Sequence, residues 1–451
     1  MTSQRLVHHL QQALCVRDIA LLLAMLVFVP LALRHTFVAY LLWGWSGLIA
    51  LDYYLYGFMM PMPYVQIFAL IAMGSWFWTK DPERQPFQPN RTMVLLVVFW
   101  AHGLLSAIFA YPGLNNNWHD FSNLSKTLLF CALMPMLVTS RFRTHAMVLM
   151  IVLAIAFHGA LDGLKFLASA GGHNARGIRK FGDNNLFALV LVMVLPLIYY
   201  LYQYSAKRLA RLSFAFTGLL TVLAIIATSS RGGFAGVAAV AIFIVLQSRR
   251  KLVGILAIVV VGVMVLQLAP ESWRERMDTI KTADEDGSFM GRVAAWKVSS
   301  AVALAHPVLG GGFRVIENAA TWDRFRNSPS LLDFVATPPV YGFKAAHSIW
   351  FQVLGDGGLV GLALFIGLLF NAFLTRRKIK AIASKDEANK WATDLADMIG
   401  AALFAYIVSG SLLSAAYSET PYILLMLMEV IKLQFQQTPK LAQGVKRGLY
   451  A

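Results

Sequence analysis

Residues 209–247, LARLSFAFTGLLTVLAIIATSSRGGFAGVAAVAIFIVLQ, contain two apolar stretches that meet at a short polar turn. Each stretch approaches the ~20 apolar residues that an α-helix needs to cross a bilayer. The turn between them, Ser229-Ser230-Arg231-Gly232-Gly233, carries an arginine, which costs roughly 2.5–3.5 kcal/mol at the centre of a membrane helix. We therefore expect a helical hairpin whose turn lies at one face of a membrane.

The whole chain has the composition of an integral membrane protein. Of its 451 residues, 58% are hydrophobic and 14% are charged. Much of the formal net charge of +16 lies in short loops between apolar stretches, which favours anionic lipid and membrane orientation over nucleic acid as its cause. No small-residue cleavage site follows the basic amino terminus, so we expect no cleavable signal sequence. Cys15 and Cys131 give neither a disulfide framework nor a metal-ligand spacing.

The apolar stretches predict an all-α polytopic membrane protein with about twelve transmembrane helices. Eleven crossings are expected near residues 62–78, 92–111, 124–139, 145–168, 185–203, 209–229, 232–247, 252–268, 348–374, 396–416 and 420–436. The stretch 18–52 is ambiguous, because Pro30 can break it and Arg34-His35 leaves little room for two full spans. We favour one net crossing there, with both termini cytoplasmic. Two crossings would give thirteen helices and an external amino terminus.

Basic loops predict the orientation of these helices. Cytoplasmic loops carry an excess of Lys and Arg, and four loops qualify, at 140–145, 205–211, 249–251 and 376–380. Alternation then puts three segments outside: 169–184, 229–231 and the long segment 269–347. The long segment has helical periodicity at 273–280 and 290–305, a glycine turn at 310–312 and Pro338-Pro339. We interpret it as a periplasmic helical lid between the ninth and tenth spans. It separates an N-terminal bundle, residues 1–268, from the C-terminal helices and tail, residues 348–451.

Two of the external segments are candidate anion sites. In the turn at 229–233, the serines can cap the next helix, and Gly232 and Gly233 let a ligand approach the backbone. The alternative is an interfacial arginine that reaches lipid headgroups. The segment 171–185, GGHNARGIRKFGDNN, holds three cations, and Asp183 or Asn184 can cap the following span. It is either an anion site or an ordinary basic loop; the cations are Arg176, Arg179 and Lys180.

Arg292 and His347 complete the candidate residues. Arg292 either faces an anion or pairs with the acidic run at 284–286, and that run is also a weak signal for a divalent cation. His347 stands at the mouth of a span and is either structural or a general base, since an unperturbed imidazole titrates near pH ~6.5. Gly355, Gly357 and Gly358 predict a bend or close packing in the outer half of that span.

Together these residues suit glycosyl transfer from a polyprenyl-diphosphate sugar. Cations can hold a diphosphate and stabilise the charge that grows on it as it leaves, and a histidine can take the proton of an attacking hydroxyl. The sequence has neither a GxxxxGK[ST] loop nor an HExxH motif, so we expect no nucleotide, metal or other cofactor.

Several motifs resemble one known family in their order and placement. They are VRDIALLL at 16–23, LLWGW at 41–45, GDNNLFALVLVMVLPL at 182–197, SSRGGFAGVAAV at 229–240, ERMDTI at 275–280, MGRVAAW at 290–296, HPVLGGGF at 306–313 and AAHSIWFQVLGDGGLVGL at 345–362. Over most of its length the chain resembles the O-antigen ligase/polymerase superfamily. Within it, the amino-terminal part is most similar to the O-glycosylation ligases associated with exosortase systems.

The resemblance implies a GT-C-like, metal-independent, inverting glycosyltransferase of the bacterial inner membrane with a periplasmic active site. It would move a glycan en bloc from undecaprenyl diphosphate to an acceptor hydroxyl, either on the lipid A-core or on a protein. Arg231 and Arg292 would hold the diphosphate, and His347 would be the base. Looser donor contacts would come from Ser230, Gly232, Arg176, Arg179 and Lys180. An O-antigen polymerase and a transporter or flippase of lipid-linked glycan remain the alternatives.

Overall fold

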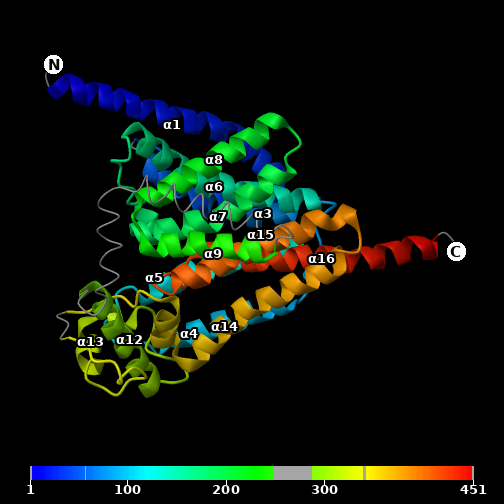
Figure 1. The fold of residues 1–451 in the computed structure, drawn as a ribbon. Coiled ribbons are helices and arrows are strands. Elements are labelled where there is room, and N and C mark those ends of the chain that lie inside the picture. The colour runs from blue at the N-terminus through cyan, green and yellow to red at the C-terminus, as the bar shows by residue number, and fades with distance from the viewer. Residues whose placement is uncertain (1–2, 56, 248–286, 339–341, 449–451) are drawn as a thin grey trace.

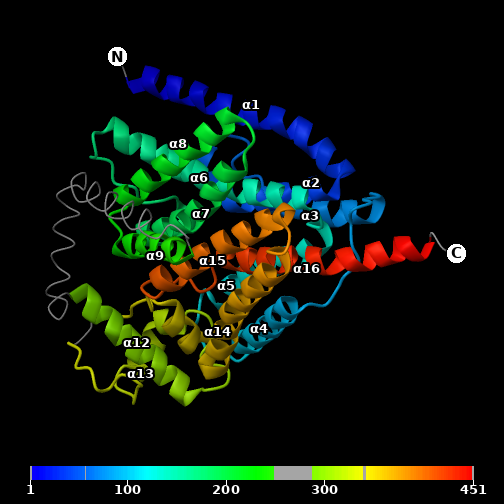
Figure 2. The same cartoon turned by 45° about the vertical axis from the view of Figure 1, so that its right-hand side comes forward.

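A computed structural model describes residues 3–55, 57–247, 287–338 and 342–448 of the chain, with the backbone alone at residues 3–15, 179, 287–288 and 437–448. Within these ranges the chain forms α-helices and short 3-10 helices but no strand, which confirms the predicted all-α class. Most helices lie side by side in one bundle, and α12 and α13 form a separate group at one end of it (Figures 1 and 2).

The bundle helices follow the apolar stretches of the sequence. Their bounds are α1 Ser3–Arg34, α2 Thr36–Ile49, α3 Tyr64–Trp78, α4 Arg91–Ile108, α5 Asn117–Leu137, α6 Arg141–Ala168, α7 Asn184–Tyr204, α8 Arg208–Ala227, α9 Arg231–Gln247, α14 Ile349–Ala383, α15 Lys390–Gly410 and α16 Glu419–Gly448. The expected crossing at 252–268 lies outside the described residues. The short 3-10 helices are η1 Leu51–Tyr54, η2 Arg179–Phe181, η3 Val315–Glu317 and η4 Glu387–Asn389.

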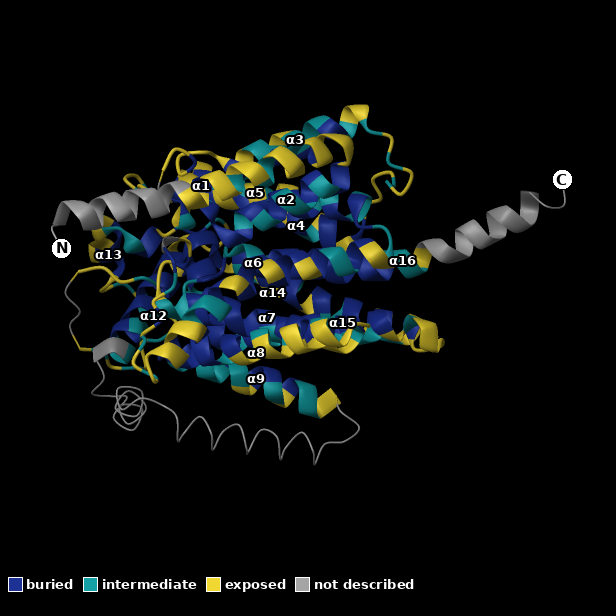
Figure 3. Cartoon of the chain, turned by 90° about the horizontal axis from the view of Figure 1, so that it is seen from above, coloured by how far each residue is buried: buried dark blue, intermediate teal, exposed yellow. Residues whose placement is uncertain are grey.

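Seven helical segments in the described ranges are long and apolar enough to cross a membrane. Three further apolar helices, α2, α3 and α9, have 10–17 residues. The predicted number of twelve crossings is therefore not confirmed. Apolar side chains are exposed on the outer faces of several helices, α1 and α8 among them, where a membrane protein contacts lipid tails (Figure 3).

The amino-terminal stretch forms two helices, and its number of membrane crossings stays a prediction. The helix breaks at His35 rather than at Pro30, which lies inside α1. His35 has an extended backbone, and α1 and α2 then pack against each other. The amino terminus lies at the end of the bundle that carries α12 and α13, whereas the carboxyl terminus lies at the opposite end (Figures 1 and 3). This arrangement matches the alternative in which 18–52 runs through the bundle twice.

An ion pair inside the bundle connects three helices. Glu429, which is fully buried, pairs with Lys432 one turn later on α16. Thr92 Oγ1 on α4 donates a hydrogen bond to Glu429 Oε2 at 2.9 Å, and Asn371 Nδ2 on α14 donates to Thr92 Oγ1 at 2.9 Å. A charge in an apolar bundle is costly unless it is paired and hydrogen-bonded, so these contacts favour one packing of α4, α14 and α16.

Helix α14 is interrupted where the glycines predicted a bend. Gly358 has φ +69° and ψ −167°, which breaks the helix after its first nine residues. The loop 306–313 docks into the break: Gly311 N–H and Gly312 N–H donate to the carbonyls of Gly355 and Asp356 at 3.0 Å. Leu359 N–H on the far side donates to the carbonyl of Pro307 at 2.8 Å. The freed backbone groups of α14 thus find partners in the loop, as a helix break inside a membrane protein requires.

Within the predicted lid, the expected helix at 290–305 is confirmed, whereas the periplasmic lid itself stays a prediction. α12 spans Gly287–Ala305 and is followed by η3 and by α13, Ala319–Phe325, which the sequence analysis did not predict. The predicted helix at 273–280 lies outside the described residues. A small apolar core joins α12, η3 and α13; it contains Val298, Val302, Val315, Ile316, Trp322 and Phe325.

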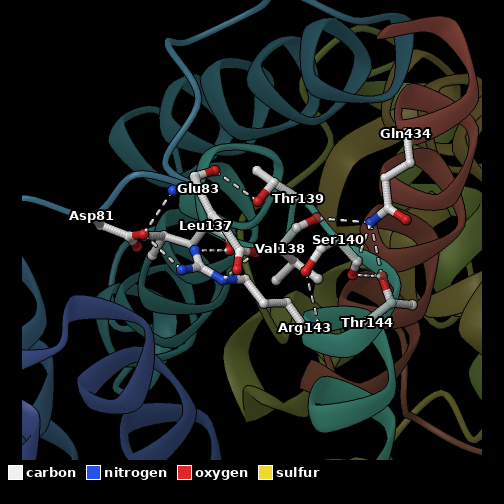
Figure 4. A network of polar contacts seen from close by, with 9 residues as sticks. All are labelled: Asp81, Glu83, Leu137, Val138, Thr139, Ser140, Arg143, Thr144 and Gln434. Atoms are coloured by element: carbon white, nitrogen blue, oxygen red, sulfur yellow. Dashed lines mark hydrogen bonds and ion pairs between the residues drawn. The ribbon is translucent and has the colours of Figure 1, made fainter. Parts of the chain in front are cut away.

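A polar network fixes the opposite end of the bundle (Figure 4). Arg143, at the start of α6, contacts Asp81 at 2.7 Å and Glu83 at 3.1 Å, and donates to the carbonyl of Leu137 at 2.9 Å. Gln434 Nε2 on α16 donates to the carbonyl of Val138 at 3.1 Å. The corner between α5 and α6 is thereby tied both to the loop after α3 and to α16.

Candidate functional site

The amino-terminal ends of α7 and α9 meet at the end of the bundle near α12. Ser230 caps α9, since its Oγ accepts a hydrogen bond from Gly233 N–H at 3.1 Å. The same hydroxyl donates to Asn185 Oδ1, in the first turn of α7, at 2.8 Å. Asp183 caps α7 by accepting from the N–H groups of Asn185 and Leu186 at 2.9 and 2.8 Å. Both predicted caps are confirmed, and two helix termini that favour anions lie together.

Arg231 is the first residue of α9 and is half-buried. The two glycines after it lie among other helices, and their expected role in letting a ligand approach stays a prediction. Both are buried, and a Cβ on Gly233 would lie 2.8 Å from the Cβ of Ala188 on α7. The carbonyl of Gly232 accepts a hydrogen bond from Ser409 Oγ on α15 at 2.7 Å. The missing side chain of Gly233 therefore allows close packing of α9 against α7, whereas a Cβ on Gly232 would have ordinary contacts no closer than 3.8 Å.

His347 precedes α14 in a strained backbone conformation. Its φ of +44° lies in the left-handed region, which non-glycine residues rarely adopt and which is enriched at functional sites. Its N–H donates a hydrogen bond to Ser414 Oγ, in the turn between α15 and α16, at 2.8 Å. The carbonyl of the preceding residue, Ala346, accepts from Trp296 Nε1 on α12 at 2.7 Å. Two distant segments thus orient this histidine.

The contact through Trp296 also brings Arg292 toward His347. Residues four positions apart lie on the same face of an α-helix, and Arg292 lies four residues before Trp296 on α12. The Trp296 ring stacks on Phe351, in the first turn of α14, with ring centroids 5.1 Å apart. Arg292, which is half-buried, therefore lies on the face of α12 that packs near the mouth of α14. The acidic run at 284–286 lies outside the described residues.

Burial and charge together lower the pKa of His347. Burial is the main cause, and the positive charges of Arg292 and Lys344 lower the pKa further. Asp183 acts in the opposite direction, which places the cap of α7 within electrostatic range of the same ring. The imidazole is consequently neutral at pH 7, the form that can accept a proton. Charges from segments that are far apart in the sequence, Asp183 and Arg292, therefore act on the same ring, and Ser230 is joined to the first turn of α7 next to Asp183.

Two of the three cations of the 171–185 segment, Arg176 and Lys180, line different cavities. Lys180 Nζ contacts Glu419 at 2.8 Å, at the start of α16, and also donates to the carbonyl of Gly47. Arg176 is exposed and lines a different cavity from Lys180. Arg179 begins η2, and its side chain is outside the described part of the structure. Arg176 and Lys180 thus face different cavities, and a shared anion site that includes Arg179 stays a prediction.

A polar cavity of about 310 Å³ lies beside His347, and we call it the central cavity. Ser414, whose Oγ accepts the hydrogen bond from His347 N–H, lines this cavity. Two ion pairs line it: Lys180 with Glu419, and Arg314 with Asp120, whose Nε and Oδ2 atoms are 2.5 Å apart. The three principal candidates, Arg231, Arg292 and His347, are not among the described residues that line this cavity.

A larger and mostly apolar cavity of about 610 Å³ adjoins it between α2, α3 and α5, and we call it the lateral groove. Lys180 and Glu419 line both cavities, so this ion pair stands where the two meet. At its outer edge Leu70 is 65% exposed and Leu129 is 45% exposed. The groove thus opens on a surface covered with apolar side chains.

Several residues of this region were missed by the sequence analysis. Asp120, Arg314, Ser414 and Glu419 stand singly in apolar or neutral surroundings in the sequence, and no local motif marks them. The best available signal was the position of Asp120 and Glu419 in the first turns of apolar helices, where acidic residues favour the helix dipole. Their partners come from elements that are distant in the sequence.

Comparison with known families divides the chain into two parts. Residues 16–206 match a family of unknown function. Residues 214–366 match the family described as O-antigen ligase, and this range contains Arg231, Arg292 and His347. No curated protein matches the chain. The match at 214–366 is consistent with the O-antigen ligase superfamily and confirms, for this part of the chain, the resemblance that its motifs indicated.

Proposed function

We propose that the protein transfers a glycan en bloc from undecaprenyl diphosphate to an acceptor hydroxyl, at the membrane face where α12 and α13 lie. The family match supports a ligase- or polymerase-type role in general terms. One observation carries the finer proposal: a neutral, strained His347 lies within electrostatic range of Arg292, beside the capped amino-terminal ends of α7 and α9. A base, a cation and two anion-favouring helix ends therefore converge.

In this proposal His347 accepts the proton of the acceptor hydroxyl. The hydroxyl oxygen forms a new bond to the anomeric carbon, the bond from that carbon to the diphosphate oxygen breaks, and the configuration inverts. Negative charge develops on the departing diphosphate. Arg231 and Arg292 bind this diphosphate and stabilise it, and the N–H groups at the start of α9, which Ser230 orients, add to the positive potential. The arginines supply the charge stabilisation, so the reaction as proposed uses no metal ion.

The two cavities suggest how the donor is held. The lateral groove is mostly apolar and opens toward exposed apolar side chains, as a polyprenyl chain that enters from the bilayer requires. Lys180 stands between the groove and the central cavity, where it would meet the diphosphate end of the lipid. Arg179 is a further proposed donor contact. Arg176 lines a separate cavity, so its contact would be with the glycan. The surface of α12 and α13 would face the periplasm, and the acceptor would be either the lipid A-core or a protein.

A direct assay tests the proposal. The purified full chain, in detergent without nucleotide or added metal, is given undecaprenyl-diphosphate glycan and either lipid A-core or an acceptor protein. We expect product with one of the two acceptors and none from His347→Ala at the same protein concentration. His119→Gln is the matched control, because His119 lies on α5 with a side chain that is 71% exposed. Normal transfer by His347→Ala would refute the assigned base.

The same samples separate the alternatives. A polymerase transfers the glycan of one carrier to the glycan of another and releases one carrier diphosphate in each step, so chain-length profiling would show longer lipid-linked glycan and no product on either acceptor. A transporter or flippase moves the donor between leaflets of reconstituted vesicles without any product. Arg292→Lys should impair transfer strongly, because lysine cannot present a planar pair of donors to a diphosphate. Arg326→Lys is the control, because Arg326 ends α13 and is 49% exposed.

A further inference from the structure

A second polar cavity lies beside the 171–185 segment, and we call it the loop pocket. It has a volume of about 210 Å³ and shares no lining residue with the central cavity. Its walls come from η1, the last turns of α6 and the loop before α7. The lining side chains that concern us are Tyr53, Tyr54, Asp162, Lys165, His173 and Arg176.

Hydrogen bonds fix the groups at the base of this pocket. Asp162 Oδ1 accepts from Lys165 Nζ at 2.9 Å and from His173 Nε2 at 3.0 Å. The Tyr54 hydroxyl lies 2.5 Å from His158 Nδ1, and the two rings stack with centroids 5.6 Å apart. These groups are held by one another before any ligand arrives, so a polar ligand would bind with little reorganisation.

The charges of the pocket do not cancel. The ammonium group of Lys165 already neutralises the carboxylate of Asp162. Arg176 is exposed, and among the described residues no carboxylate forms an ion pair with it. The pocket thus combines a positive charge with hydroxyl, imidazole and carboxylate groups that both donate and accept hydrogen bonds. Tyr53, which is 45% exposed, adds an aromatic surface.

This combination fits the chemistry of an acidic sugar. A sugar ring presents hydroxyl groups that donate and accept hydrogen bonds, and C–H groups that pack against an aromatic ring. A carboxylate or phosphate on the sugar would be attracted to Arg176, whose guanidinium can bind either group through two hydrogen bonds. A neutral sugar would leave this charge without its ligand and would therefore bind more weakly.

The chain connects the loop pocket to the proposed reaction site over a short distance. Ile178 lines the loop pocket, Lys180 lines the central cavity, and Asp183 influences the pKa of His347. Five residues separate Ile178 from Asp183, and an extended chain covers at most about 3.6 Å per residue, or about 18 Å in total. A glycan of a few sugar units would reach from one site to the other.

We propose that the loop pocket binds one acidic sugar residue of a glycan substrate, a short distance from the sugar that reacts. The role of the pocket in glycan transfer rests on the proposed function, whereas binding of the sugar to the pocket does not depend on that function. All residues of the pocket lie between 53 and 178, inside the match to the family of unknown function and outside the ligase match. The amino-terminal part would thus recognise the glycan on which the carboxyl-terminal part acts.

Binding of glucuronic acid to the purified full chain tests the proposal, with glucose as the neutral comparison. We expect saturation-transfer NMR to show glucuronic acid binding at least tenfold more tightly than glucose. Arg176→Gln should weaken it at least fivefold and should not lower the melting temperature, since Arg176 is exposed. Arg208→Gln is the control, because Arg208 is an exposed arginine at the start of α8. Tyr53→Leu provides a second variant and should weaken both sugars alike.

Equal binding of the two sugars, no binding of glucuronic acid, or unchanged binding by Arg176→Gln would overturn the proposal. The His347→Ala variant keeps the two proposals distinct: it should lose transfer and bind glucuronic acid normally. Normal transfer by that variant would refute the reaction and leave the pocket standing. In transfer assays of Arg176→Gln, a raised KM for the lipid-linked donor would show that the acidic sugar belongs to the donor. A raised KM for the acceptor would show that it belongs to the acceptor.

Discussion

Replacing Ser414 with alanine tests whether one hydrogen bond orients the proposed base. Ser414 Oγ accepts the backbone N–H of His347 at 2.8 Å and lies in the wall of the central cavity. His347 has a left-handed backbone, which is unfavourable for a residue with a side chain and therefore needs external support. Alanine removes the acceptor and leaves the rest of the turn between α15 and α16 unchanged.

The contact sets the expected size of the effect. A partly buried N–H group that loses its only acceptor costs about 1–3 kcal/mol. If the whole cost falls on the reactive orientation of the imidazole, each 1.36 kcal/mol lowers the rate tenfold, and kcat falls roughly 5- to 150-fold. The KM for the donor should change little, because Ser414 does not belong to the proposed diphosphate contacts.

Initial rates of glycan transfer at saturating donor measure this effect in detergent-solubilised protein. Ser418→Ala is the matched control: Ser418 lies four residues away and lines the same cavity, and its buried Oγ forms no hydrogen bond among the described residues. We expect that control to transfer within twofold of the wild type. A Ser414→Ala variant with an unchanged kcat, or an equal loss in both variants, would refute the positioning role.

Three further changes probe charge and packing. Arg292→Gln should move the acid limb of the pH–rate profile to higher pH, because the arginine is one of the charges that lower the pKa of His347. Arg143→Gln should lower the free energy of unfolding at pH 7 by about 3 kcal/mol, because it leaves the carboxylate of Asp81 without its partner. Burial alone raises the pKa of Asp81, but the hydrogen bond and charge of Arg143 bring it below its usual 3.8. The ionised carboxylate therefore stabilises the folded protein at pH values above 3.8, and this stabilisation is lost as the pH falls through the lower pKa of Asp81 in the folded protein. The difference in unfolding free energy between the wild type and Arg143→Gln should thus shrink below pH ~4. Gly310→Ala should cost about 1–2 kcal/mol from its φ of +64°, and more because the new Cβ would lie 2.5 Å from the backbone of α14.

Each change has a control and a contradicting result. Gly342→Ala has the same positive φ, +72°, but open space around the Cβ, so the difference in melting temperature from Gly310→Ala isolates the clash. Equal melting temperatures would contradict the docking of loop 306–313 into α14. Unfolding by denaturant at pH 7 and pH 3 tests Arg143→Gln, and a pH-independent difference would exclude Asp81 as the cause. An acid limb that stays in place in Arg292→Gln would remove Arg292 from the electrostatic surroundings of His347.

Much of the helical architecture and two of the caps were predictable, because both depend on nearby residues. Apolar runs located most of the bundle helices, although the bounds of α5, α14, α15 and α16 differ by six to twelve residues at one or both ends, and Ser230 and Asp183 cap α9 and α7 as expected. The break at His35 was not predicted. Pro30 has the stronger local signal, yet α1 continues through it to Arg34.

The candidate site was predicted less completely. His347 and Arg292 were identified as candidate residues. Their proximity depends on the hydrogen bond from Trp296 to the carbonyl of Ala346, two residues that lie 50 positions apart in the sequence. Gly233 was predicted to let a ligand approach the backbone, but a glycine equally allows close approach of another helix. Only the packed structure shows that the neighbour is Ala188 of α7.

The sequence by itself indicated a helical membrane protein with a part, residues 214–366, that is similar to the O-antigen ligase family, because apolar runs, caps and motifs are local properties of the chain. Tertiary structure alone decided which charges meet. Lys180 pairs with Glu419, and Arg314 pairs with Asp120, across separations of 239 and 194 residues. In an apolar bundle a charged side chain is stable only beside a partner, and that partner is fixed by how the helices pack rather than by the residues that surround it in the sequence.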